Sequence, residues 1–206
     1  MSWECVYRTP TAEGDHAMYA TEYAKFGIKV YGNADVAEKK QFPYGSYNIL
    51  KPERSCHIGS FTVVPFENYH DVPIFGYLIH HQNMGTLLFS TDSYKIGLAI
   101  TGISHYLIEA NYSDELLKQN VWSGKINKAQ ADRIMLSHMS LDYCVKYLRD
   151  CSVGGCTTAT KSITLCHLSE RNSDPALFKR TVESAFGIPC YVAQKGTVVE
   201  LNNTLI

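Results

Sequence analysis

Residues 11–16 read Thr-Ala-Glu-Gly-Asp-His and place an acid beside an imidazole where a strand should give way to a helix. Residues 3–7, before this stretch, form a strand-like run, and apolar or aromatic residues recur at helical spacing over residues 17–26 after it. Asp15 and His16 would therefore open a helix, where both side chains can face a metal ion. The alternative is that Asp15 only caps the helix by accepting hydrogen bonds from backbone N–H groups.

Four later stretches carry further acids and histidines at the ends of predicted elements. In chain order they are Tyr69-His70-Asp71, Ser90-Thr91-Asp92, Ser137-His138-Met139-Ser140 and Cys166-His167-Leu168-Ser169-Glu170-Arg171-Asn172. Together with residues 11–16, and in this order, they resemble the motifs of the metallo-β-lactamase-fold hydrolases. The chain looks most similar to their phosphodiesterase and nuclease branch, which includes tRNase Z-like enzymes and anti-Pycsar cyclic-nucleotide phosphodiesterases. The resemblance runs from about residue 5 to residue 201.

The resemblance implies a fold of the α/β class, an αββα four-layer sandwich of the metallo-β-lactamase type. The signature of these hydrolases is a His-x-His-x-Asp-His run. In this chain Thr11 and Glu13 stand at its first two histidine positions. The family also carries further strands ahead of the signature, whereas Thr11 follows only ten residues here. We therefore expect a shortened sandwich that lacks the usual first strands. The length favours a single domain over residues 1–206.

The resembled enzymes hold two metal ions that polarise a phosphoryl group and activate a water molecule. Carried over residue by residue, the intact half of this site consists of Asp15, His16, Asp92 and His167. These side chains are a complete nitrogen and oxygen ligand set for Zn²⁺ or Mn²⁺. The resemblance therefore implies one or two bound ions.

The other half of the implied site keeps His70 and Asp92 but has Thr11 and Glu13 in place of two imidazoles. Glu13 is a competent oxygen ligand and Thr11 is a poor one, so this half should prefer manganese or magnesium. Occupancy by one ion is the default expectation. The alternative is a decayed site, in which Glu13 pairs with a neighbouring cation.

The candidate catalytic residues are His138, Asp15 and Glu13. His138 matches a family histidine that acts as an acid near the metals, and the ordinary pKa of histidine suits this role. Its alternative role is to cap the turn before the next helix. Asp71 would orient His70. Glu109, at the end of a predicted strand, resembles a conformational position of the family rather than a ligand.

Several polar residues have no assigned place in this set. Arg133 and Arg171 could meet a phosphate, but the sequence does not locate them. Tyr44 and Tyr47 are either substrate contacts or packing residues. The remaining histidines of the later part of the chain are predicted to be structural or exposed: His57, His80, His81 and His105.

Composition narrows the class of protein. Hydrophobic residues make up 45% and charged residues 19% of the chain, as in soluble globular proteins. A net charge of −1 gives no broad electrostatic surface for duplex nucleic acid and leaves a small anionic substrate, such as a nucleotide, as the expected ligand. The seven cysteines form no C-x-x-C pair, the N-terminus is not a signal peptide, and no apolar run could span a membrane. We expect a cytoplasmic protein.

The periodicity predicts alternating strands and helices. Strands are expected at 28–31, 56–58, 61–66, 75–79, 86–90, 106–110 and 162–166, with those between 53 and 92 in one antiparallel-rich sheet. Helices are expected at 34–40, 114–119, 129–136, 141–148 and 175–186. Residues 41–52 are predicted to be a loop, and 190–192 with 198–201 a hairpin. A sheet edge without its usual neighbours favours a homo-oligomer.

These observations lead to one functional hypothesis and two alternatives. The hypothesis is a metal-dependent hydrolase of phosphodiester bonds, with a cyclic nucleotide as one candidate substrate. The first alternative is a catalytically lapsed protein that binds or sequesters a nucleotide, which the Thr11 and Glu13 changes favour. The second is a structural or interaction subunit.

Overall fold

The computed structural model describes residues 4–6, 19–151, 153 and 160–202. Its helices are α1 (Ala20–Lys25), α2 (Ala34–Lys39), α3 (Asp114–Trp122), α4 (Lys128–Ser137), α5 (Leu141–Asp150) and α6 (Pro175–Phe186). Its strands are β1 (Glu4–Val6), β2 (Lys29–Gly32), β3 (Tyr47–Ile49), β4 (Cys56–Ile58), β5 (Phe61–Tyr69), β6 (Ile74–His81), β7 (Gly85–Ser90), β8 (Lys95–Ile96), β9 (His105–Glu109), β10 (Ser162–Cys166) and β11 (Cys190–Val192).

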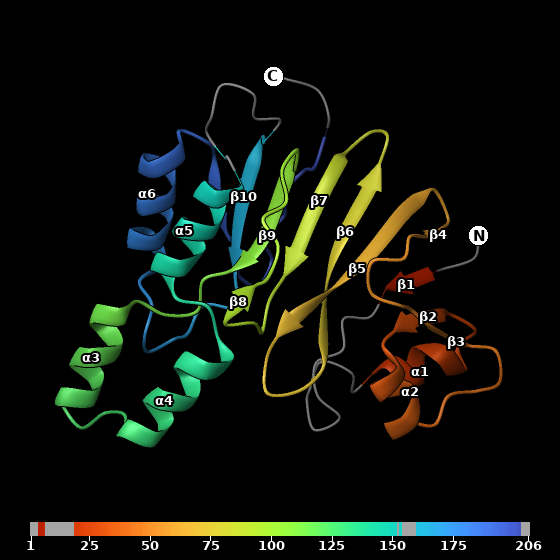
Figure 1. The fold of residues 1–206 in the computed structure, drawn as a ribbon, viewed down its shortest axis with the longest axis horizontal. Coiled ribbons are helices and arrows are strands. Elements are labelled where there is room, and N and C mark those ends of the chain that lie inside the picture. The colour runs from red at the N-terminus through yellow and green to blue at the C-terminus, as the bar shows by residue number, and fades with distance from the viewer. Residues whose placement is uncertain (1–3, 7–18, 152, 154–159, 203–206) are drawn as a thin grey trace.

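A large mixed sheet crosses the molecule, with the strand order β11-β10-β9-β7-β6-β5-β4 (Figure 1). The half made of β4 to β7 is antiparallel, as the sequence predicts, and β8 pairs with β5. The half made of β7, β9, β10 and β11 is parallel. Since neighbouring parallel strands run in one direction, the carboxyl ends of β7, β9 and β10 lie together at one edge of the sheet.

The largest part of the core lies between this sheet and helices α5 and α6, which cover one of its faces (Figure 1). Every residue of β10 is buried, as is typical of a parallel strand covered on both faces. Helix α5 contributes one apolar stripe, formed by Leu141, Cys144, Val145 and Leu148. Helices and sheet are therefore held by burial of apolar surface.

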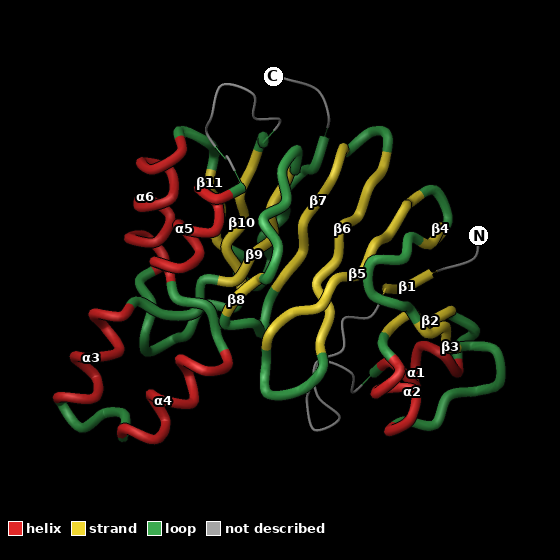
Figure 2. Tube along the Cα trace, viewed as in Figure 1, coloured by secondary structure: helices red, strands yellow, loops and turns green. Residues whose placement is uncertain are grey.

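A small parallel sheet, β1-β2-β3, lies on the other side of the large sheet (Figure 2). Tyr31 of β2 and Leu50 pack with Val63 and Tyr77 of the large sheet. Helix α1 packs on the outer side of β2 through buried alanines. The layers therefore run helix, sheet, sheet, helix, in agreement with the predicted sandwich.

The predicted elements are largely confirmed. Helices α2, α3, α5 and α6 each begin at a residue whose side chain accepts a hydrogen bond from the first turn, namely Asn33, Ser113, Ser140 and Asp174. Two predictions are wrong. Residues 41–52 contain strand β3, which pairs with β2. Residues 198–201 form no strand and therefore no hairpin with β11, which pairs with β10 in parallel register. The predicted strand ends at residues 3 and 7 and the helix start at residue 17 lie outside the described residues.

Within the described residues, no helix is long and apolar enough to cross a membrane. Cysteines that no disulfide joins include the buried Cys144, Cys151, Cys166 and Cys190 and the partly buried Cys56.

Candidate metal centre

Three side chains with metal-binding chemistry come from the carboxyl ends of three neighbouring parallel strands. Asp92 follows β7 by two residues, Glu109 is the last residue of β9, and His167 directly follows β10. The register places Cys166, the last residue of β10, opposite Glu109. The parallel topology therefore brings together groups that lie far apart in the sequence, at the edge of the sheet where ligands of α/β proteins commonly bind.

The fourth side chain belongs to His138, at the carboxyl end of helix α4. The segment after it is fastened beside β9. Asn111 donates its backbone N–H to the carbonyl of Met139 at 2.8 Å, and Leu141 donates to the carbonyl of Tyr112 at the same distance. These backbone bonds hold His138 against the end of β9.

The four groups form one compact cluster. His167 Nδ1 lies 2.9 Å from Asp92 Oδ1 and 2.8 Å from Glu109 Oε1. His138 Nδ1 lies 2.8 Å from the same Glu109 oxygen and 3.9 Å from Asp92 Oδ1. One potential ligand atom from each of the four residues lies within 4.8 Å of all the others. Such a set of two carboxylates and two imidazoles fits a divalent ion such as zinc or manganese.

The backbone at this edge of the sheet has an uncommon conformation. Among the described residues other than glycine, three have a positive φ, and two of them are Asp92 at 49° and His167 at 58°. A positive φ is costly for residues with a β-carbon and is often found at functional sites. The turns after β7 and β10 therefore direct both side chains into the cluster at some cost in backbone energy.

The cluster combines buried negative charge with one strongly basic imidazole. The Glu109 side chain is fully buried and that of Asp92 is 5% exposed. Burial lowers the pKa of His167, but hydrogen bonds to Asp92 and Glu109 outweigh the burial and raise this pKa to about 10. Two buried carboxylates need a compensating positive charge. The proton on His167 supplies one such charge, and a divalent cation held by His167 would replace that proton, because a histidine that binds a metal is neutral.

Of the residues predicted from the sequence, Asp92, His138 and His167 meet in this cluster. His70 lies beside it, with its ring centroid 5.9 Å from that of His138. The His70 imidazole contacts Asp71, and both residues line a cavity of about 400 Å³. The remaining predicted residues lie outside the described part of the chain: Thr11, Glu13, Asp15 and His16.

Glu109 is the member of the cluster that sequence reasoning left out of the ligand set. It accepts hydrogen bonds from both histidines through one oxygen and from the Ser93 backbone N–H, at 2.8 Å, through the other. An acid at the end of an otherwise apolar strand could have indicated this place in the cluster, because a carboxylate is costly to bury without partners.

The other histidines and tyrosines that the sequence singles out are not members of the cluster. His57 and His80 are exposed and pair with threonines on neighbouring strands. His105 is buried and bonds to Ser162 and to the carbonyl of Asn202. Tyr44 is fully exposed, whereas Tyr47 stacks on Phe42. Tyr47 therefore has a packing role.

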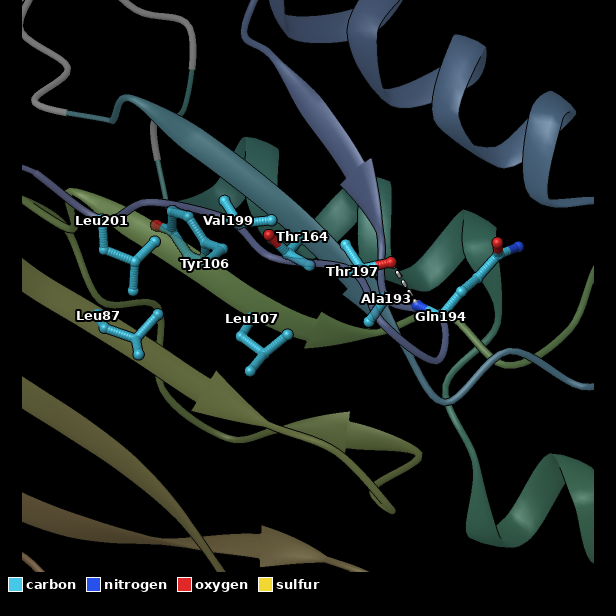
Figure 3. A pocket seen from close by; sticks show the side chains of 9 residues that line it. All are labelled: Leu87, Tyr106, Leu107, Thr164, Ala193, Gln194, Thr197, Val199 and Leu201. Atoms are coloured by element: carbon cyan, nitrogen blue, oxygen red, sulfur yellow. Dashed lines mark hydrogen bonds between the residues drawn. The ribbon is translucent and has the colours of Figure 1, made fainter.

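A second cavity, of about 230 Å³, lies over β7, β9 and β10, where residues 193–201 cross the sheet (Figure 3). Its lining is largely apolar, and the backbone N–H of Gln194 is bonded to the Thr197 hydroxyl. The lining contains no carboxylate, imidazole or thiol. Since burial also raises the pKa of its one phenol, Tyr106, this cavity lacks acid–base or metal chemistry.

No protein-family model matches the sequence, and no curated protein matches it either. Solved structures do match. The metallo-β-lactamase-fold protein YhfI from Bacillus subtilis is similar with a TM-score of 0.71 at 15% identity, over 96% of this chain and 78% of that chain. Igni18, a metallo hydrolase from Ignicoccus hospitalis, has a TM-score of 0.66 at 12% identity over the same shares. The short form of human tRNase Z has a TM-score of 0.55 at 12% identity, again over the same shares.

These similarities, at 15% identity or less, show that this chain has the metallo-β-lactamase fold. A fold hosts many chemistries, so the function has to be argued from the site.

Proposed function

We propose that the protein is a metal-dependent hydrolase of phosphodiester bonds. One observation carries the proposal: Asp92, Glu109, His138 and His167 converge within 4.8 Å at the carboxyl ends of parallel strands. The similarity to tRNase Z and to a metallo hydrolase supports the same reaction class, since both share the fold that builds this edge.

Asp92 and His167 are the first residues that would hold the metal, because Asp92 Oδ1 lies 2.9 Å from His167 Nδ1 and 3.9 Å from His138 Nδ1. Asp15, His16, His70 and Glu13 are proposed as further ligands. A bound divalent ion would lower the pKa of a water molecule and neutralise charge on the phosphoryl oxygens. Zinc or manganese, as one or two ions, fits the oxygen and nitrogen donors.

Glu109 and His138 have complementary roles in this proposal. A carboxylate only accepts, so the hydrogen shared by His138 Nδ1 and Glu109 lies on the histidine. This bond fixes the orientation of the ring. The second nitrogen, Nε2, can then release a proton to the leaving oxygen of the phosphodiester, which is the general-acid role. The side chain of His138 is 23% exposed, so it can reach a substrate.

The experiment measures metal content and turnover together. Protein purified without chelator should contain zinc or manganese by mass spectrometry and should hydrolyse bis-p-nitrophenyl phosphate in added Mn²⁺. Asp92→Ala should lose most of the metal and the activity, because Asp92 contacts both histidines of the cluster. His57→Ala, an exposed residue on β4, is the matched control and should retain both. Equal metal content in Asp92→Ala and the parent would refute the assignment.

A second candidate is a lapsed enzyme that binds a nucleotide without hydrolysing it. Thr11 and Glu13, which stand where the family signature has histidines, favour this candidate. Replacing both by histidine should create or raise activity if the site has decayed. A parent that is active and loses activity on this double change would instead make Glu13 an adapted catalytic group.

A further inference from the structure

A cavity of about 310 Å³ lies between the α3–α4 pair and the turn that follows β10. Part of its lining is apolar and part is cationic. The lining residues are Ile126, Gln130, Arg133, Ile134, Ser169, Arg171 and Asn172. The volume lies at the lower end of the range for small-ligand sites, which is roughly 300–1,000 Å³.

Both walls of this cavity belong to segments that also carry a histidine of the candidate metal centre. The turn after β10 contributes His167 to the cluster and, two residues later, Ser169 to the cavity. Helix α4 contributes Arg133 to the cavity and ends at His138. Arg133 precedes His138 by five residues, which is about 7.5 Å along a helix. A ligand in the cavity would therefore lie beside both segments that carry the histidines of the cluster.

The two arginines place two positive charges on the lining of the cavity. Both are exposed, and neither forms an ion pair with a described residue. Their acidic neighbours in the sequence, Asp132 and Glu170, are not among the lining residues. Guanidinium groups bind phosphate through paired N–H donors.

Side-chain hydrogen bonds hold the turn that carries Arg171. Asn120, buried in α3, donates to the Arg171 carbonyl at 2.8 Å and to Asn172 Oδ1 at 2.9 Å. Asn172 is 2% exposed, and its side chain donates to the Ser169 hydroxyl at 3.2 Å. These bonds fix the backbone of the turn that carries Arg171, so ligand binding would not have to order this loop.

We propose that this cavity binds the nucleotide adjacent to the scissile bond, with its phosphate on Arg133 and Arg171. The apolar wall of Ile126 and Ile134 would then lie against the base or sugar. The inference rests on the proposed function and names its substrate class, a short single-stranded oligonucleotide. A cyclic mononucleotide has one phosphate and cannot occupy the metal centre and this cavity with separate phosphates.

The test measures binding apart from turnover. A fluorescein-labelled trinucleotide is titrated by fluorescence anisotropy in EDTA against the parent, Arg133→Gln, Arg171→Gln and the double variant. Arg180→Gln, an exposed arginine on α6 outside the cavity, is the control. Each cavity variant should bind about tenfold more weakly than the parent. The slope of log affinity against log salt should become shallower by about 0.7 for each phosphate that an arginine no longer neutralises.

Activity gives a second readout. The cavity variants should raise KM for the trinucleotide and leave hydrolysis of bis-p-nitrophenyl phosphate and of a cyclic mononucleotide within twofold of the parent. A double variant that binds the trinucleotide as the parent does, or a parent that does not bind it, overturns the inference. A parent that binds tightly through these arginines but hydrolyses nothing supports the cavity and refutes the proposed function, so the two failures are distinguishable.

Discussion

At the scale of single residues, the cluster depends on one carboxylate that serves two imidazoles. Glu109 Oε1 accepts a hydrogen bond from Nδ1 of His138 and from Nδ1 of His167, each at 2.8 Å. Its other oxygen is held by the Ser93 backbone. Partners of this kind set the ring orientation of metal-binding histidines and raise their basicity.

Glu109→Gln should therefore weaken metal binding by about 10–100-fold while leaving the shape of the side chain unchanged. Competition with a chromogenic chelator at neutral pH measures the affinity. Glu115→Gln, an exposed acid on α3, should bind metal as the parent does. An affinity of Glu109→Gln within twofold of the parent would contradict a role for this carboxylate in the centre.

Because His105 is buried, we expect the stability of the protein to depend on pH. Burial lowers the pKa of His105 below its ordinary value near 6.5, and Lys161 lowers it further, although a bond to the Asn202 carbonyl raises it in part. The unfolded chain therefore binds more protons than the folded chain between the folded pKa and 6.5. The free energy of unfolding should fall as pH decreases through this window, by at most about 1.4 kcal/mol per pH unit.

His105→Gln keeps a donor for Asn202 and an acceptor for Ser162 but cannot titrate. Urea unfolding of the parent and the variant at pH 7 and pH 5 isolates the effect, because the other ionisable groups contribute equally to both proteins. The parent should lose more stability than the variant between these pH values. Parallel losses would show that His105 does not bind a proton on unfolding.

At the scale of elements, α3 is tied to the turn after β10 by Asn120 and not by apolar contact alone. The amide of Asn120 satisfies the Arg171 carbonyl and the Asn172 side chain in a buried position. The turn carries His167 at one end and leads into α6 at the other. A helix outside the main core thus holds the backbone beside the candidate centre.

Asn120→Ala should destabilise the protein by about 1–3 kcal/mol, because it leaves buried acceptors without a donor. The adjacent Gln119→Ala removes only an exposed bond to Glu115 and should cost about 0.5 kcal/mol or less. Urea unfolding of both variants gives the comparison. Equal costs would mean that the Asn120 bonds add nothing to stability.

At the scale of the whole molecule, burial of apolar surface between the large sheet and helices α5 and α6 holds the strands that carry the cluster. Phe178 of α6 is fully buried there, whereas its neighbour Leu177 is 41% exposed. The position of the sheet edge that carries the cluster therefore depends on this core.

Phe178→Ala should reduce the free energy of unfolding by about 3–5 kcal/mol, because the truncated side chain leaves a cavity. Leu177→Ala should cost about 1 kcal/mol or less. Chemical unfolding measures both. Similar costs at the two positions would place the core elsewhere than between α6 and the sheet.

The sequence by itself indicated the class of the fold, through motifs that resemble those of the metallo-β-lactamase-fold hydrolases. It determined most of the elements, because helix caps and strand periodicity are local properties. Ser140 before α5 and Asp174 before α6 are examples, since each side chain binds the first turn of its own helix. Asp92, His138 and His167 could be predicted because they lie in short motifs at element ends that resemble the motifs of these hydrolases.

Only the tertiary structure decided how these residues meet. The parallel register of β7, β9 and β10 brings Glu109 to the histidines, and no local pattern encodes which strands are neighbours. The same holds for strand β3 and for the cavity of Arg133 and Arg171, whose walls lie more than thirty residues apart in the sequence. Strand order and packing are long-range choices, set by the burial of whole faces rather than by any short stretch.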